Sequence, residues 1–474
     1  MDMGRECPIL GGMRYCSTRS DAAPIGFSDV LMRGLAPDGG LYVPETWPAL
    51  TRPAQGAGYI ETAFSVLAPF CAPDLNQPTL LTLLEDTYTP RTDGFSTPLV
   101  APLRRLDDRL SVLELFHGPT LAFKDVALQL LGRLFGHNLA TTGKKITILG
   151  ATSGDTGSAA IEGCRHAAGA EIFILYPHNR PSEVQRRQMT TVDAPNVHAI
   201  AIEGDFDDCQ AIVKTLFADA GFRARRNLSA VNSINWARIA AQIVYYVHAA
   251  YAHARPVNVI VPTGNFGNIY AAYAAKKMGA PIARLVVASN RNDILPRVIE
   301  TGRMERRPVE PSLSPSMDIQ ISSNFERLIF DLLDRDPAAS ALAMGDFTRA
   351  GVLALPDHAC EILRENFAGM RCDDAQTLAA ITAAKRDYDY LIDPHTATAF
   401  HAWNGLKNEL EGPCVALACA HPAKFPDAVE RATGIRPALP HAMADLLDRR
   451  ERFTVLPADS DAVRGFIEKN TGFA

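Results

Sequence analysis

Residues 145–158 read KITILGATSGDTGS, and this stretch decides the class of fold. A short β-branched run at residues 145–149 leads into a loop of small residues and then into a segment with helical spacing. Similar runs recur at residues 171–175, 197–202 and 257–261. Runs of this kind that alternate with helical segments predict βαβ units on a parallel sheet. We therefore expect an α/β fold.

Further elements follow from the same patterns. Asp205 precedes apolar residues at helical spacing, which predicts an N-capped amphipathic helix, and residues 236–251 predict a longer helix. Apolar runs at 285–288 and 414–417 extend the sheet. Residues 303–315 are rich in Arg, Pro and Glu without any period, and we expect a surface loop there.

The chain divides into regions of different character. We expect residues 1–12 to be an upstream extension, because a sequence of different character begins at Met13. Residues 13–95 carry Gly- and Pro-rich turns but no strand, Gly-rich loop and helix in series, which predicts an N-terminal accessory domain. We expect one α/β domain at 96–255 and a second at 256–474.

Composition excludes several classes of protein. With 47 Lys+Arg against 53 Asp+Glu the net charge is −6, which argues against nucleic-acid binding. No run of apolar residues approaches the ~18 that a membrane span needs, and we see no secretory leader. The nine cysteines are scattered without a C-x-x-C pair, so we expect neither a disulfide framework nor a metal site. These features favour a cytoplasmic protein.

Two loops have the geometry that binds anions. Residues 150–158 and 262–268 each follow an apolar run and precede a helical segment, so backbone N–H groups and a helix N-terminus would face a ligand. Neither loop is a Walker A motif or a G-x-G-x-x-G motif, which disfavours nucleoside triphosphates and dinucleotides. The alternative is that the glycines only permit close helix packing, but two such loops in one chain favour binding.

A third segment, ELFHGPTLAFKD at residues 114–125, places Lys124 in an apolar and aromatic setting. Desolvation there would lower the pKa of the amine and make it a nucleophile. The alternative is a surface lysine paired with its neighbour Asp125. A fourth segment, residues 393–399, is by itself only an Asp-Pro turn and a helix start.

Taken together, the motifs resemble the threonine synthase family of pyridoxal-phosphate enzymes, in its longer bacterial and fungal type. The resemblance implies the tryptophan-synthase-β-like fold (fold type II), with two parallel-sheet α/β domains and an N-terminal accessory domain. It covers nearly the whole chain and rests on nine segments in order: residues 13–19, 36–44, 116–125, 151–157, 232–238, 264–268, 316–327, 393–396 and 420–425.

The resemblance also implies roles for single residues. Lys124 would be the Schiff-base lysine, and Thr396 would face the pyridine nitrogen of the cofactor. The cofactor phosphate would lie in the loop formed by Gly264, Asn265, Phe266, Gly267 and Asn268. The substrate would be bound by Ser153, Gly154, Asp155, Thr156 and Arg238, with Arg238 and Lys424 as candidates for the leaving phosphate.

The implied reaction converts O-phospho-L-homoserine and water into L-threonine and phosphate, with pyridoxal 5'-phosphate as cofactor and no metal. Two alternatives remain open at this point. One is another fold-type-II enzyme, such as a threonine or serine dehydratase or a cysteine synthase. The other is a catalytically silent homologue that only binds a ligand, although such a protein would need no imine-forming lysine. The oligomeric state, monomer or homodimer, is left open.

Overall fold

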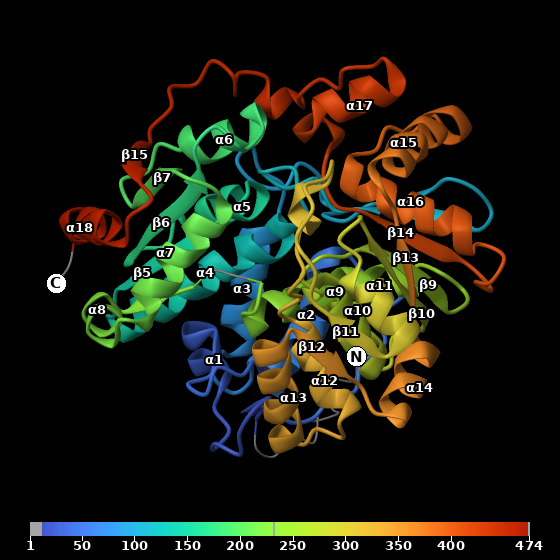
Figure 1. Cartoon of the computed structure of the whole chain (residues 1–474), viewed down its shortest axis with the longest axis horizontal. Coiled ribbons are helices and arrows are strands. Elements are labelled where there is room, and N and C mark those ends of the chain that lie inside the picture. Colours follow the sequence, from blue (N-terminus) through green and yellow to red (C-terminus); the bar gives the residue numbers. More distant parts are fainter. Residues whose placement is uncertain (1–11, 231–232, 473–474) are drawn as a thin grey trace.

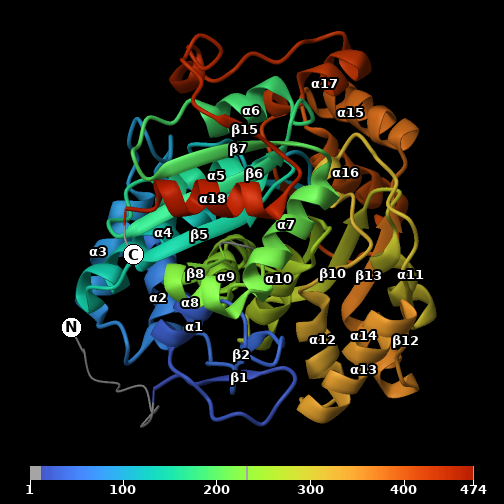
Figure 2. The same ribbon diagram turned by 60° about the vertical axis from the view of Figure 1, so that its left-hand side comes forward.

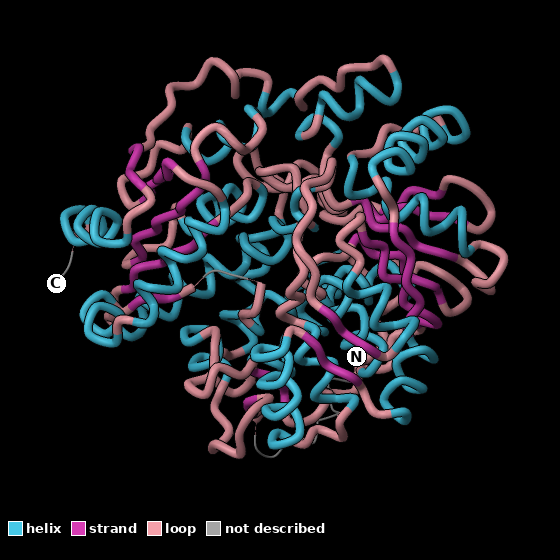
Figure 3. The backbone as a smooth tube through the Cα atoms, viewed as in Figure 1, coloured by secondary structure: helices cyan, strands magenta, loops and turns pink. Residues whose placement is uncertain are grey.

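The computed structural model describes residues 12–230 and 233–472. The expected extension at residues 1–12 therefore lies outside the described residues, except for Gly12, and so does Asn232 of the segment at 232–238. Figure 1 shows two β-sheets that stand next to each other with helices around them. Figure 3 shows their strands as two main groups in magenta, on either side of the molecule.

The five-stranded sheet has the strand order β15-β7-β6-β5-β8, and every neighbouring pair is parallel. The strands expected at 145–149, 171–175 and 197–202 are confirmed within it. Its strands are β5 (Ile146–Ala151), β6 (Ala170–Pro177), β7 (Val197–Glu203), β8 (Leu228–Ser229) and β15 (Thr454–Pro457). The helices on it are α4 (Lys124–Thr142), α5 (Asp155–Cys164), α6 (Glu183–Thr190), α7 (Phe206–Ala218), α8 (Ala220–Arg226) and α18 (Ser460–Asn470).

Strand β6 shows why this sheet is covered on both faces. Ile172 and Ile174 pack into the main core, whereas Phe173 and Leu175 pack into a second core on the opposite face. Successive side chains of a strand point to opposite faces, so an uninterrupted apolar run requires a helical layer on each side.

The six-stranded sheet has the order β13-β10-β9-β14-β4-β3, and all its pairs are parallel except the edge pair of β3 and β4. Its strands are β3 (Leu103–Arg105), β4 (Leu110–Glu114), β9 (Val257–Pro262), β10 (Ile282–Ser289), β13 (Phe367–Arg371) and β14 (Cys414–Ala418). Its helices are α9 (Trp236–Tyr251), α10 (Gly267–Lys277), α11 (Ile294–Thr301), α12 (Phe325–Leu332), α13 (Pro337–Ala350), α14 (Asp357–Asn366), α15 (Asp374–Tyr388), α16 (Pro394–Leu406) and α17 (Pro426–Thr433).

The N-terminal residues form β1 (Tyr15–Ser17), α1 (Phe27–Arg33), β2 (Tyr42–Pro44), α2 (Tyr59–Cys71) and α3 (Gln77–Tyr88), with β1 and β2 antiparallel. Figure 2 shows β1, β2 and α1 together at the bottom of the view. An ion pair ties this region to α12, because Nη2 of Arg19 lies 2.6 Å from Oε2 of Glu326.

The sheets correct two sequence expectations. Strand β4 pairs with β14, with β3 beside it at the edge, and β15 pairs with β7, so a boundary at residue 256 does not separate the two sheets. A strand pattern predicts a strand but not its partner, because pairing depends on which sheet edge is free in space. Residues 303–315 are not all loop, since β11 (Arg303–Glu305) pairs with β12 (Val352–Ala354).

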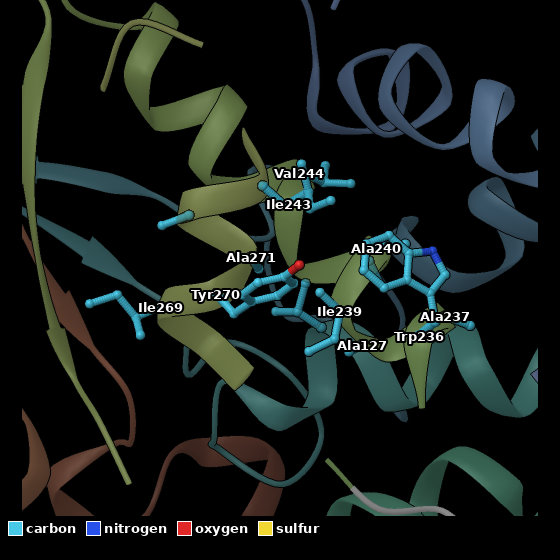
Figure 4. Packing of buried hydrophobic residues seen from close by; sticks show 14 of the residues in the cluster. Ala127, Trp236, Ala237, Ile239, Ala240, Ile243, Val244, Ile269, Tyr270 and Ala271 are labelled. Atoms are coloured by element: carbon cyan, nitrogen blue, oxygen red, sulfur yellow. The ribbon is translucent and has the colours of Figure 1, made fainter. Parts of the chain in front are cut away.

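Helix α9 is buried on nearly all sides, which is typical of a helix that is apolar all round. It therefore lies between other elements of the fold and connects them. Figure 4 shows Ile239 and Ala240 of α9 close to Tyr270 of α10 and Ala127 of α4. This packing fixes the starts of three helices relative to one another, and the starts of these helices form the site.

Candidate active site

The site lies where helices begin beyond the carboxyl ends of parallel strands. Lys124 is the first residue of α4, and Asp155, which follows β5, is the first residue of α5. Nζ of Lys124 lies 3.3 Å from Oδ2 of Asp155, and both side chains are buried. Open α/β sheets bind ligands at this edge, where backbone N–H groups are free. The structure thus brings Lys124 and the 153–156 loop into one site.

The charges of this pair shift one another's titration. Burial lowers the pKa of Lys124, and the Asp155 carboxylate only partly opposes that shift. Burial alone would raise the pKa of Asp155, but Lys424, then Lys124 and His395, hold it well below its usual range. Asp155 is therefore ionised at neutral pH, beside a lysine whose amine is easier to deprotonate than a surface lysine.

Lys424 belongs to the same cluster. It lies after β14 in the 3-10 turn Pro422–Lys424, and its side chain is fully buried. Its Nζ lies 3.0 Å from Oδ1 of Asp155, 2.7 Å from the carbonyl oxygen of Thr120 and 2.9 Å from Oε1 of Gln188. The ammonium group thus makes two hydrogen bonds and one ion pair within the protein.

Helix α6 supplies two residues that the sequence analysis missed. Nε2 of Gln185 donates to Oδ1 of Asp155 at 2.9 Å, and Nε2 of Gln188 donates to the carbonyl of Thr120 at 3.0 Å. The two glutamines are three positions apart and so lie on one face of the helix. In sequence, Gln185 is visible only as the partner of Ser182 in a capping box, which marks a helix start and not a site.

The predicted substrate loop is shaped by Thr152. Its hydroxyl oxygen accepts from the N–H groups of Gly154 at 3.0 Å and Gly157 at 2.9 Å. Gly154 has φ +148°, and a Cβ there would lie 2.6 Å from the side chain of Gln185. Ser153 and Thr156 are half-buried, which leaves them able to contact a ligand.

The predicted phosphate loop follows β9. Gly264 is half-buried and Asn265 is exposed, whereas Phe266 adopts the left-handed conformation (φ 62°) and leads into α10 at Gly267. Ser322 Oγ donates to the carbonyl oxygen of Gly264 at 2.7 Å. The side chain of the last loop residue, Asn268, is buried.

Thr396 lies at the start of α16, where Asp393 is the N-cap. The Thr396 hydroxyl donates to Asp393 and accepts from the N–H of Cys419 at 3.2 Å. Nδ1 of His395 also bonds Asp393, at 2.7 Å, while Nε2 accepts from the N–H of Ser316. Because Ser316 Oγ donates to Oδ2 of Asp155 at 3.1 Å, this helix start is linked to the Lys124 cluster.

Arg238, the third residue of α9, is 3% exposed, and its Nη1 has no hydrogen-bond partner. Nδ2 of Asn268 is buried without a partner as well. Buried donors in folded proteins are usually satisfied, and a bound anion would supply an acceptor for both of these atoms. Together with a buried lysine amine and the N-terminus of α10, they fit a cofactor that carries both an aldehyde and a phosphate.

Family profiles match most of the chain. The profile described as "Pyridoxal-phosphate dependent enzyme" covers residues 91–420, "Threonine synthase N terminus" covers 14–88 and "Threonine synthase, C-terminal" covers 396–467. A threonine synthase from Pseudomonas aeruginosa is 52% identical over 466 residues, which is 97% of this chain and 98% of that protein. The chain belongs to the threonine synthase family.

Solved structures agree with this assignment. The pyridoxal-phosphate-bound threonine synthase of Brucella melitensis has a TM-score of 0.93 at 46% identity and covers 97% of this chain and 100% of that chain. The yeast threonine synthase has a TM-score of 0.90 at 37% identity, with 96% and 98% coverage. The expected fold type II is confirmed. The protein is a pyridoxal-phosphate-dependent lyase, and pyridoxal 5'-phosphate is its cofactor.

Residues 12–230 and 233–472, which the structure describes, contain no helix long and apolar enough to cross a membrane. They also contain no group of three or more His, Cys, Asp or Glu side chains that could hold a metal ion.

Proposed function

We propose that the protein converts O-phospho-L-homoserine and water into L-threonine and phosphate. The observation that carries this proposal is the buried cluster in which one carboxylate, Asp155, lies between Lys124 and Lys424. A phosphorylated amino acid brings several negative charges into the site. Buried lysine ammonium groups in the site can compensate these negative charges, whereas a substrate without net charge would not require such cations.

Lys124 is the residue that would hold the cofactor covalently, because its amine is buried and its pKa is lowered. The backbone N–H groups of Gly264 to Asn268 would bind the cofactor phosphate at the N-terminus of α10. Thr396 would lie at the pyridine nitrogen. Its hydroxyl is backed by Asp393, which fixes the direction of the hydroxyl proton.

The reaction moves protons at three carbon atoms. Protons leave Cα and Cβ, the Cγ–O bond breaks as phosphate departs, Cγ gains a proton to become the methyl group, and water adds its hydroxyl at Cβ while Cα is reprotonated. The bound cofactor supplies an electron sink for the negative charge that develops at Cα and Cβ. Nζ of Lys124 takes and returns protons at these carbons, and the Asp155 carboxylate 3.3 Å away holds that amine in place.

Residues around the cluster would bind and enclose the substrate. Ser153, Thr156 and the N–H groups at the start of α5 suit the substrate carboxylate, because the Asp155 side chain is already turned toward the two lysines. Lys424 suits the leaving phosphate. Ser316, which contacts Asp155, covers the site from the segment before α12 and helps to exclude water.

The test is product analysis with purified, cofactor-loaded protein and O-phospho-L-homoserine. We expect phosphate and threonine in equal amounts. An oxo acid and ammonia in place of threonine would instead favour a dehydratase, and binding without turnover would favour a silent homologue. A cytoplasmic location also remains part of the proposal, supported by the described cysteines, all of which are free thiols.

A further inference from the structure

The site contains two buried cations that differ in their partners. The Lys424 ammonium forms an ion pair with Asp155 and donates hydrogen bonds to the carbonyl of Thr120 and to Gln188. Nη1 of Arg238 has no partner, and among the residues that the structure describes no carboxylate forms an ion pair with this side chain. Burial lowers the pKa of Arg238 to about 10, so the guanidinium is still charged at neutral pH. A buried charge without a counter-charge is costly unless a ligand supplies one.

The residues next to Arg238 on α9 relate its position to the phosphate loop. Arg238, Gln242 and Tyr245 are spaced i, i+4 and i+7 and so lie on one face of α9, and the pKa of Arg238 responds to Tyr245. The Tyr245 hydroxyl donates to Oδ1 of Asn268, the last residue of the phosphate loop. The face of α9 that carries Arg238 therefore points toward the phosphate loop.

The packing of α9 against α10 supports the same location. A Cβ added at Gly267 would lie 3.4 Å from Cδ1 of Ile239, the residue after Arg238. Figure 4 shows Ile239 next to Tyr270 and Ala271 of α10. The start of α9 therefore lies against the start of α10, where the dipole of α10 favours an anion.

The amide of Asn268 has a fixed orientation. Its Oδ1 accepts from the hydroxyls of both Tyr245 and Tyr246, the latter at 2.7 Å, so the amide oxygen cannot turn away. Nδ2 is thus held as a donor, yet it is buried and has no partner. Two unsatisfied donors, one of them charged, belong to side chains around the same helix N-terminus.

We infer that Arg238 and the Asn268 side chain complete the phosphate cradle of the cofactor, with the guanidinium as the counter-charge of the phosphate. The inference rests on the proposed cofactor site at Gly264 to Asn268. It reassigns Arg238, for which the sequence analysis proposed the leaving phosphate of the substrate, and it leaves Lys424 as the cation for that group.

The test compares two ligands that differ only in the phosphate. Apoenzyme is titrated with pyridoxal 5'-phosphate and with pyridoxal, and binding is followed by absorbance without substrate. In Arg238→Met we expect affinity for pyridoxal 5'-phosphate to fall about 10- to 100-fold, because a charge-assisted contact is lost, while affinity for pyridoxal changes less than about threefold. At saturating cofactor, the KM for O-phospho-L-homoserine should stay within about threefold of the wild-type value.

Arg238→Lys is the second variant. It keeps a cation in place and should recover most of the preference for the phosphorylated ligand. Arg386→Met, which removes an exposed arginine of α15 far along the chain from the loop, is the matched control for loss of one charge. Circular dichroism of each variant checks that it folds.

Each possible outcome either supports or contradicts the role of Arg238 in binding the cofactor phosphate. Equal losses for both ligands, an unchanged preference in Arg238→Met, or a preference in Arg238→Lys no better than in Arg238→Met would contradict the inference. A raised KM with unchanged cofactor affinity would assign Arg238 to the substrate phosphate instead. If the wild-type protein itself did not prefer pyridoxal 5'-phosphate over pyridoxal, the proposed cofactor site would fail rather than the role of Arg238.

Discussion

Nζ of Lys124 donates to Oδ2 of Asp155 across 3.3 Å, although the two residues are 31 positions apart and open different helices. The other oxygen of the same carboxylate lies 3.0 Å from Nζ of Lys424. One buried carboxylate therefore forms ion pairs with two lysines.

Replacing the nucleophile should remove covalent cofactor attachment. We expect Lys124→Ala to lower activity by about 10³-fold or more, because both attachment and proton transfer at Nζ are lost. After borohydride treatment, mass spectrometry should find the cofactor on Lys124 in the wild type and nowhere in the variant. Attachment to a different lysine in the wild type would refute this role.

Asp155→Asn should change the pH dependence of cofactor uptake. The carboxylate raises the pKa of Lys124 against the effect of burial, so its removal lowers that pKa further. More of the amine is then unprotonated at a given pH, and the midpoint of the pH profile for cofactor uptake by apoenzyme should move to lower pH. Asp346→Asn, on the surface of α13, serves as control. A midpoint that stays or rises would show that Asp155 does not act on Lys124.

Asp125→Asn should change stability with a defined sign. Burial raises the pKa of Asp125 from 3.8 to about 6, so the folded state favours its protonated form. The resulting stability is present at low pH and is lost as pH rises through about 6. Relative to Asp125→Asn, which cannot ionise, the wild type should lose about 2 kcal/mol in free energy of unfolding between pH 4.5 and 7.5. Urea denaturation at both pH values measures this, and a parallel pH response of the two proteins would contradict it.

Gly264→Ala should weaken cofactor binding. A Cβ at this position would lie 3.1 Å from Cα of Met317 and 3.2 Å from the carbonyl oxygen of Ser316, so backbone would have to move. Gly465→Ala is the matched control, because its Cβ would meet nothing within 4 Å and α18 gains a better helix former. We expect about a tenfold or greater loss of cofactor affinity for Gly264→Ala only. Equal affinities of the two variants would mean that the loop tolerates a side chain.

Much of the fold was predictable because its signals are local. The strand before residues 150–158 and the helix capped by Asp205 follow from hydrophobic period and capping chemistry, and both are confirmed. The placement of β4 and β15 was not predictable, since each is short and pairs with a strand far away in sequence, β14 and β7 respectively. A short strand carries no information about which sheet edge it will meet.

The residues of the site also differ in whether the sequence predicts them. Lys124 and the two small-residue loops stand out because strand, loop and helix follow one another in the sequence. Gln185 and Gln188 do not, because only the position of α6 in space turns that helix face toward Asp155 and Thr120. Arg238 was visible only within a matching motif, and its lack of a partner is a property of the packed structure.

The most direct test of the account is to incubate the cofactor-loaded protein with O-phospho-L-homoserine and to measure phosphate and threonine together. The account predicts that both appear at a ratio of one to one, and that Lys124→Ala produces neither. Phosphate release without threonine, or no release from a protein that stays yellow, would contradict the proposed reaction.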